Sequence, residues 1–145
     1  MPRRGAHKPA MRPGGGRACI VMACSDLREA DQVSRQLAEL NTGYLITYRR
    51  GEDLMLNAPT RKVALVILAT EDDPPALRIA LRWLRHNWPR CPVTVVSDAG
   101  SGEEEMAARE GGAGFLTRPV SAGQWSSLLS HALRESRVQQ PSTDA

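Results

Sequence analysis

The feature of this sequence that most constrains its fold is a regular alternation of short apolar runs with segments of helical spacing. The apolar runs span residues 18–23, 44–48, 63–68, 93–96 and 114–116. The segments that follow them span residues 26–40, 51–57, 75–87, 103–110 and 122–137. A short apolar run between turn signals is typical of a strand, and apolar recurrence every three or four residues is typical of a helix. The chain is therefore predicted to repeat a strand–helix unit five times.

Because a helix follows every predicted strand, each connection between strands is long enough to cross over the sheet, and the sheet is predicted to be parallel. Helices then cover both faces of that sheet, which explains why a run such as Val63–Leu68 is apolar throughout. Five units within residues 18–137 predict a flavodoxin-like, doubly wound α/β fold. We expect a five-stranded parallel sheet in the order 2-1-3-4-5 with five helices. Functional residues in such a fold lie at the carboxyl ends of the strands.

The boundaries of two helices can be predicted from local signals. In segment 26–40, one broad apolar face is expected to be buried, formed by Leu27, Ala30, Val33, Leu37 and Leu40. Asp26 with Glu29 three residues later predicts a capping box, and Gly43 is expected to end this helix. Asp73 and Pro74 are expected to be the cap and first residue of the helix after the third strand.

Charge and composition separate the ends of the chain from its middle. Five of the 19 basic residues lie within residues 1–17 without any acid, which leaves 14 basic against 16 acidic residues elsewhere. Residues 1–17 are predicted to be a disordered basic tail and residues 138–145 a second disordered tail.

No run approaches the ~18 apolar residues of a membrane span. Three cysteines suit neither a disulfide framework nor a metal site, so we expect a cytoplasmic protein. No Gly-rich phosphate loop or metal cluster occurs at the strand ends, so we expect no cofactor.

Three segments near the strand ends resemble the receiver domains of bacterial two-component response regulators. Residues 65–69 resemble the third strand of that family, and residues 92–97 resemble the fourth strand, which ends in Ser or Thr. Residues 110–119 resemble the glycine-alanine turn, the fifth strand and the Lys-Pro pair that follows it. The resemblance covers residues 18–137, and the segments occur in the family's order and spacing.

The resemblance implies a phosphoryl-transfer switch. In receivers an Asp that ends the third strand accepts a phosphoryl group, and two acids that end the first strand hold Mg²⁺. A Ser or Thr hydroxyl and a Lys then hold the transferred group. The bond between Arg118 and Pro119 corresponds to one that is often cis in this family.

The sequence departs from the family pattern at the residues that carry the chemistry. The acceptor position falls on Ala69, and the acid pair falls on or next to Ala23 and Cys24. The lysine position holds Arg118, a cation with a different donor geometry, whereas Ser97 is retained. We interpret these five residues as a degenerate phosphorylation pocket without catalytic residues or a metal. Phe115 takes the place of the family's switch aromatic and is expected to keep one rotamer.

Four features of the strand ends allow two interpretations each. The acidic loop of Glu71, Asp72 and Asp73 is either a displaced acceptor or a solvated loop, and the loop is favoured. Ser97 and Arg118 either bind an anion or only fix two loops, and the second is favoured. Cys24 is either a redox-sensing thiol or, as we favour, a small buried apolar residue. Asp98 is expected to cap a loop rather than point into the crevice.

The helix predicted at residues 75–87 offers a surface for recognition. Opposite its buried leucines, Ile79 and Trp83 lie one turn apart and form a candidate partner or dimer contact, with a semi-buried pair as the alternative. Arg78 and Arg82 belong to a basic stripe beside them, which is either a solvated face or a contact for an acidic partner.

These observations predict a phosphorylation-independent atypical receiver that is not an enzyme. It would act as a protein–protein interaction module in bacterial two-component-type signalling, with a signalling protein or a second copy as the partner. One alternative is a phosphorelay receiver with a displaced acidic acceptor. The other is a regulator that binds nucleic acid through the basic tail, which is less favoured because five charges without aromatic residues bind weakly and nonspecifically.

Overall fold

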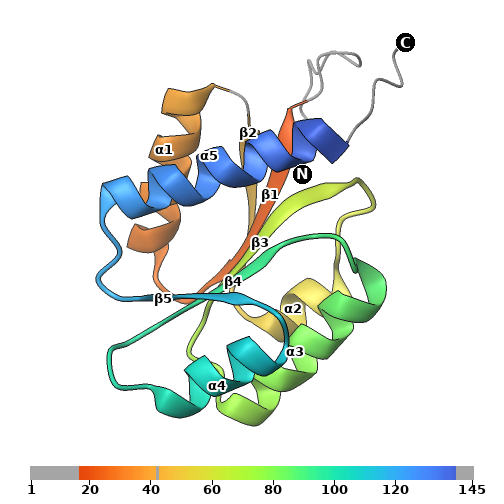
Figure 1. Ribbon diagram of the computed structural model, residues 1–145, viewed down its shortest axis with the longest axis vertical. Helices are drawn as coiled ribbons and strands as arrows, with labels where there is room; N and C mark the ends of the chain where they lie inside the picture. The colour runs from red at the N-terminus through yellow and green to blue at the C-terminus, as the bar shows by residue number, and fades with distance from the viewer. Residues whose placement is uncertain (1–16, 42, 140–145) are drawn as a thin grey trace.

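A five-stranded parallel sheet forms the centre of the structure, in the order β2-β1-β3-β4-β5 (Figure 1). The structure, a computed structural model, describes residues 17–41 and 43–139. The strands are β1 (Ala18–Cys24), β2 (Gly43–Tyr48), β3 (Val63–Ala69), β4 (Val93–Ser97) and β5 (Gly114–Thr117). The helices are α1 (Leu27–Leu40), α2 (Gly51–Leu56), α3 (Pro74–Asn87), α4 (Gly102–Glu110) and α5 (Ala122–Gln139). The predicted fold class and strand order are confirmed.

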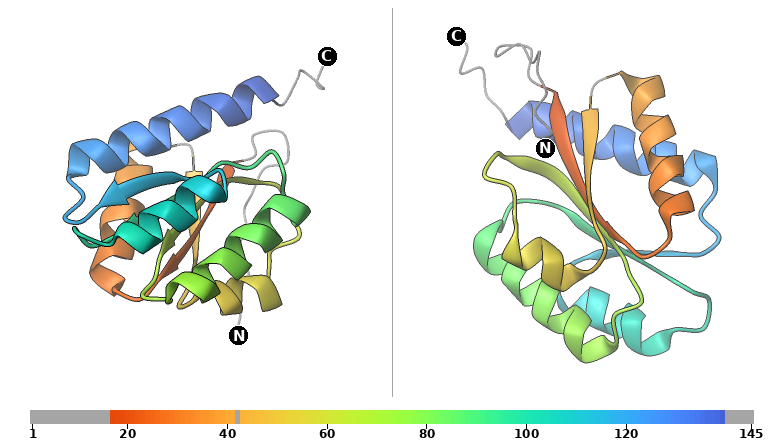
Figure 2. Two further views of the ribbon diagram at one scale, coloured as in Figure 1. Left: turned by 60° about the horizontal axis from the view of Figure 1, so that its bottom comes forward. Right: turned by 180° about the vertical axis from the view of Figure 1, so that it is seen from behind.

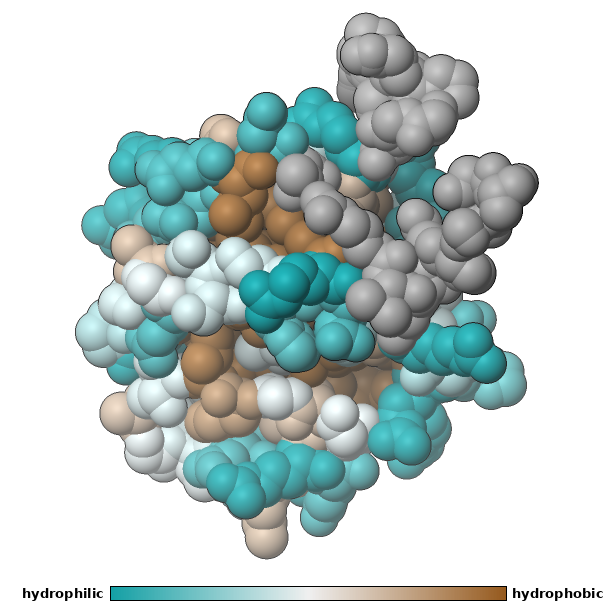
Figure 3. All heavy atoms as spheres, turned by 45° about the horizontal axis from the view of Figure 1, so that its top comes forward, coloured by the Kyte–Doolittle hydropathy of each residue, from teal (hydrophilic) through white to brown (hydrophobic). Residues whose placement is uncertain are grey.

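Helices cover both faces of the sheet, as the apolar runs predicted. Helices α1 and α5 lie on one face, and α2, α3 and α4 lie on the other (Figures 1 and 2). Alternate residues of β1 point to opposite layers: Ile20 and Met22 pack with α1 and α5, whereas Val21 and Ala23 pack in the other layer. Every residue of β3 is buried. On the face shown in Figure 3, hydrophilic side chains predominate at the periphery, and apolar side chains are visible between them.

Helix α1 differs from its prediction at both ends. Leu27 was expected to be buried, but it is 77% exposed because it is the first residue of the helix and lies outside the packed layer. Asp26 caps the helix, with its Oδ1 accepting the Arg28 amide at 2.9 Å. Glu29 does not complete a capping box, because both its oxygens bind Arg118 instead.

The residue that ends α1 is Asn41 rather than Gly43. Asn41 takes the left-handed conformation with φ 57°, which asparagine adopts more readily than most residues. Gly43 instead begins β2, where an added Cβ would lie 3.1 Å from the Leu37 side chain and 3.3 Å from the Ala18 carbonyl oxygen. The glycine is therefore explained by the close approach of α1 and β1 to this position.

The predicted start of α3 is confirmed. Asp73 Oδ1 accepts the amide of Ala76 at 2.9 Å, and Pro74 is the first residue of the helix. Proline suits this position because its missing N–H would have no partner within the helix.

Residues 1–16 and 140–145, which make up most of the two predicted tails, lie outside the described residues. The nucleic-acid alternative depends on the basic N-terminal tail, so it stays a prediction. Arg17, which was assigned to the basic tail, donates a hydrogen bond to the Gly43 carbonyl at 2.9 Å. Helix α5 continues to Gln139, two residues past its predicted end at residue 137. None of the helices within the described ranges has the length and apolar character needed to cross a membrane.

Candidate functional site

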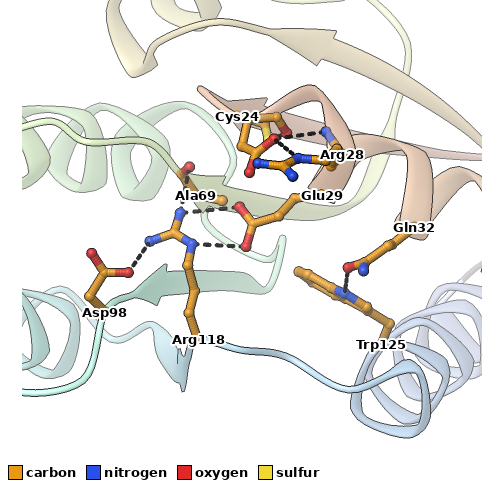
Figure 4. Close-up of polar contacts among 9 residues, drawn as sticks. Cys24, Arg28, Glu29, Gln32, Ala69, Asp98, Arg118 and Trp125 are labelled. Atoms are coloured by element: carbon orange, nitrogen blue, oxygen red, sulfur yellow. Dashed lines mark hydrogen bonds and ion pairs between the residues drawn. The ribbon is translucent and has the colours of Figure 1, made fainter.

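The carboxyl ends of β1, β3 and β4 meet around the side chain of Arg118, which directly follows β5 (Figure 4). Parallel pairing sets Cys24 beside Ala69 and Ser97 beside Thr117. The Arg118 amide donates to the Ser97 carbonyl at 2.8 Å, which extends the β4–β5 pairing by one residue. The bond from Arg118 to the following proline is cis, as the family resemblance implied.

The guanidinium group of Arg118 uses all three nitrogens in contacts within the protein. Its Nε and Nη2 donate to the two carboxylate oxygens of Glu29 at 2.8 and 3.1 Å, a bidentate arrangement. Nη2 also donates to the Ala69 carbonyl at 3.0 Å. Nη1 donates to Asp98 Oδ1 at 3.3 Å. Arg118 therefore ties together α1, the end of β3, the loop after β4 and the end of β5.

The Arg118–Glu29 pair is largely shielded from water. The side chains of Arg118 and Glu29 are 23% and 12% exposed, whereas that of Asp98 is mostly exposed. Burial alone lowers the pKa of Arg118, but the hydrogen bonds and charges of Glu29 and Asp98 outweigh it and raise this pKa above its ordinary value. Arg118 is thus a permanent cation whose charge is compensated inside the protein.

The surroundings of Arg118 carry more negative than positive charge. Glu29 and Asp98 contact the guanidinium group directly. Glu104 of α4 lies close enough to interact electrostatically with Asp98 and Arg118. Burial, followed by the charge of Asp98, raises the pKa of Glu104, and these effects outweigh the lowering of this pKa by the Ser101 hydrogen bond and the Arg118 charge. Three carboxylates for one guanidinium group make this site unfavourable for an added anion.

Cys24 and Ala69 lie in the same buried layer as this site. Ala69 is fully buried and presents only a methyl group. The Cys24 thiol donates to the Asp26 carbonyl at 2.8 Å, and burial is the main cause of its raised pKa, so the thiol stays protonated. This environment fits a small buried residue better than a reactive thiolate. Ala23, although adjacent, packs in the opposite layer with α2, α3 and α4.

The structure adds two residues to the site that the sequence interpretation assigned elsewhere. Glu29 was assigned to a capping box and Asp98 to a loop cap, but both carboxylates contact Arg118. Arg118 lies at the strand ends, and its side chain contacts both the end of β3 and the loop after β4. That Ser97 and Arg118 fix loops rather than bind an anion stays a prediction. Arg118 follows β5 at a strand end that is shielded from water, and a shielded cation requires a counter-charge, which is the one sequence signal that pointed to an acid near this position.

The acidic loop after β3 has local structural partners. Asp73 caps α3, as described above. Asp72 Oδ2 accepts the Gly51 amide at 3.4 Å, and the Asp72 amide donates to Thr70 Oγ1 at 3.3 Å. The loop borders an open polar hollow of about 660 Å³ that includes Arg49. Within residues 17–41 and 43–139, no group of three His, Cys, Asp or Glu residues is arranged to hold a metal ion.

The proposed recognition face of α3 is partly occupied by contacts within the protein. Ile79 is exposed, whereas Trp83 is half-buried and meets the ring of Trp88 edge-on, with centroids 5.5 Å apart. Arg78 pairs with Glu110 of α4 at 3.4 Å. The exposed members of this face that remain are therefore Ile79 and Arg82.

Phe115, the residue at the switch-aromatic position, is half-buried in β5. It packs against the layer of α2, α3 and α4 and pairs in register with Val95 of β4. The expectation that it keeps one rotamer stays a prediction.

Comparisons by sequence find no relatives of this chain: no family model and no curated protein matches it. Comparison by structure finds many chains of similar fold. The receiver domain of DrrB from Thermotoga maritima, in its BeF₃-activated form, is 19% identical with a TM-score of 0.68, and the match covers 81% of this chain and 98% of that one. The chemotaxis response regulator CheY4 of Vibrio cholerae is 16% identical with a TM-score of 0.68, covering 81% and 99%.

The beryllofluoride-activated NtrC4 receiver domain, solved as a dimer, is 18% identical with a TM-score of 0.69, and the match covers 81% of this chain and 97% of that one. At these identities the likeness concerns the fold. The chain has the receiver fold of response regulators, over nearly the whole length of each of these domains.

Proposed function

We propose that this protein is a receiver-like module that aspartyl phosphorylation does not switch. The observation that carries the proposal is the guanidinium group of Arg118, which binds Glu29 and the Ala69 carbonyl at the end of β3. The family resemblance places the phosphoryl acceptor and its lysine at Ala69 and Arg118. At this point the chain has a methyl group and a cation that is already paired.

The chemistry of aspartyl phosphorylation lacks its reacting groups here. Ala69 has no oxygen to attack a phosphoryl donor. The positions assigned to the Mg²⁺ ligands, Ala23 and Cys24, supply no carboxylate, and Mg²⁺ strongly prefers oxygen ligands. A phosphoryl group next to Arg118 would have to replace Glu29 and approach Asp98 and Glu104. Each of these steps costs free energy because like charges approach or a shielded ion pair is broken.

Recognition of a protein partner is then the remaining role that a receiver fold commonly supports. We infer that the partner belongs to a bacterial two-component-type pathway and that the module is not an enzyme. The exposed Ile79 with Arg82 on α3 is the contact surface we favour. The free cysteines Cys19, Cys24 and Cys91 are consistent with the reducing cytoplasm.

A phosphodonor assay tests the proposal. The full chain is incubated with Mg²⁺ and acetyl phosphate, and its intact mass is measured. We expect no phosphoryl adduct. A stable adduct would overturn the proposal. Its loss in either Asp72→Asn or Asp73→Asn would assign the adduct to the acidic loop, and an unchanged adduct in both variants would reject that loop as the acceptor. A receiver domain that retains its acceptor Asp serves as the positive control.

The partner surface is tested separately with matched variants. Ile79→Asp places a charge in the proposed contact, and Leu56→Asp does the same at an exposed leucine on α2. A partner that co-purifies with the wild-type protein is expected to be lost with Ile79→Asp and retained with Leu56→Asp. Equal retention by both variants would reject this surface.

A further inference from the structure

A cavity of about 250 Å³ opens at the amino-terminal edge of the sheet. Its floor includes Val63 and Ala64, the first residues of β3, whereas the Arg118 site lies at Ala69, the other end of the same strand. At ~3.3 Å per residue the two sites are about 20 Å apart along β3. The cavity is therefore separate from the degenerate pocket, and its volume approaches the ~300 Å³ lower limit of small-molecule sites.

The walls of the cavity are apolar and held in place by packing. Trp88 forms part of the wall, and its ring is fixed edge-on against Trp83, with an interplanar angle of 77°. Pro89, Pro92 and Cys91 of the loop before β4 complete it. The thiol of Cys91 lies 3.5 Å from the Pro92 carbonyl, and burial raises the pKa of Cys91 to about 12. Cys91 therefore adds an uncharged surface rather than a nucleophile.

The rim of the cavity is positively charged. It carries Arg61, Lys62 and Arg90 against one acid, Glu135 of α5. The Arg61 side chain is engaged elsewhere: its Nη1 donates to the Tyr44 hydroxyl at 2.6 Å, and its guanidinium group lies over the Tyr44 ring. Lys62 and Arg90 form no ion pair with another residue of the described ranges. They are the two cations available to a ligand.

We propose that this cavity binds a small organic monocarboxylate with an apolar body, such as an aromatic or branched-chain acid. The body would lie against Trp88 and the first residues of β3, and the carboxylate would face Lys62 and Arg90. The chain's own tails are poor occupants by composition. Residues 1–17 carry only positive charge, like the rim, and residues 140–145 contain no large apolar side chain.

The test is a titration of the full chain, read by amide NMR shifts at Ala64 and Cys91 and by tryptophan fluorescence. The probes are benzoate, 3-methylbutanoate and indole-3-acetate. We expect saturable changes with at least one of them. For each carboxylate that binds, the corresponding uncharged carboxamide should bind about tenfold more weakly. This factor corresponds to ~1.4 kcal/mol of binding free energy for the lost charge contact. No saturable change with any probe, or equal affinity for the amide, would overturn the proposal.

Charge variants localise the effect without disturbing the core, since the altered side chains are exposed. Lys62→Glu and Arg90→Glu should each weaken binding about tenfold, and Glu135→Gln should strengthen it. Arg49→Glu is the matched control, because Arg49 is an exposed arginine at the opposite edge of the sheet. If Arg49→Glu weakened binding as much as the rim variants, the carboxylate would be responding to net charge and the site would be rejected.

Discussion

Removing Glu29 tests whether the Arg118 site is held together by its own charges. Glu29→Ala deletes both acceptors of the bidentate contact, at 2.8 and 3.1 Å. Arg118 would keep the Ala69 carbonyl and the exposed carboxylate of Asp98. The guanidinium group would then sit partly shielded with only one weak counter-charge. We therefore expect the fold to survive and its stability to fall.

The magnitude follows from burial. A hydrogen bond to a charged group contributes ~1.5–3 kcal/mol, and removing one partner of a fully buried pair costs ~3–5 kcal/mol. The Arg118–Glu29 pair is shielded but not fully buried, so about 2–3 kcal/mol is expected for Glu29→Ala. The pair Arg109–Glu105 is shorter, at 2.6 Å, but its side chains are 73% and 41% exposed. Such a helical surface pair contributes only ~0.3–0.5 kcal/mol, because water screens it.

Two double-mutant cycles compare these pairs directly. One uses Glu29→Ala with Arg118→Met, and the other uses Glu105→Ala with Arg109→Met, each measured by urea unfolding. The coupling free energy should be about 2 kcal/mol for the first cycle and below ~0.5 kcal/mol for the second. Unchanged m-values would show that the denatured state is not the source of the difference. Equal coupling in the two cycles would refute the claim that shielding makes the Arg118–Glu29 pair strong.

Three further predictions concern stability. Asp73→Ala should cost ~1 kcal/mol in urea unfolding because it removes the α3 cap, whereas Glu71→Ala, at an exposed loop position, should cost almost nothing. Stability should fall as pH rises from ~8.5, because the unfolded thiols ionise first while the pKa of Cys91 in the folded protein is raised to about 12. Urea unfolding between pH 7 and 10 measures how steeply the free energy of unfolding falls with pH, and Cys91→Ala should make this fall smaller. An equal fall in the wild-type protein and in Cys91→Ala would contradict a role for the buried thiol. Gly112→Ala should destabilise by about 1 kcal/mol or more, since φ is +76° there, whereas Gly102→Ala, with open space around its Cβ, should be neutral; thermal unfolding distinguishes them.

The fold was predictable because its signals are local and repeated. Helices cover β1 and β3 on both faces of the sheet, so these two strands appear in the sequence as unbroken apolar runs. The cap at Asp73 was predictable for the same reason, because the residues that form it are three apart. Leu27 was mispredicted because helical periodicity does not show where the packed layer ends.

The site was only half predictable, because its decisive contact joins distant residues. Arg118 and Glu29 are separated by 89 positions, and no local pattern links them. Glu29 also satisfied a local rule, the capping box, which competed with the contact that the protein forms. The cavity beside Trp88 was not predicted at all. It depends on how the loops before β3 and β4 pack against each other, and periodicity carries no information on that packing.

We propose that the pocket around Ala69 and Arg118 does not respond to a phosphoryl group. The most direct test is a titration of the full chain with Mg²⁺ and beryllium fluoride, a phosphoryl mimic, followed by backbone amide NMR. We expect no saturable shift at Ala69, Ser97 or Arg118, because the Arg118 cation is paired with Glu29 and position 69 carries no carboxylate acceptor. Saturable shifts centred on these residues would contradict it and would show that the pocket still binds a metal and a phosphoryl group.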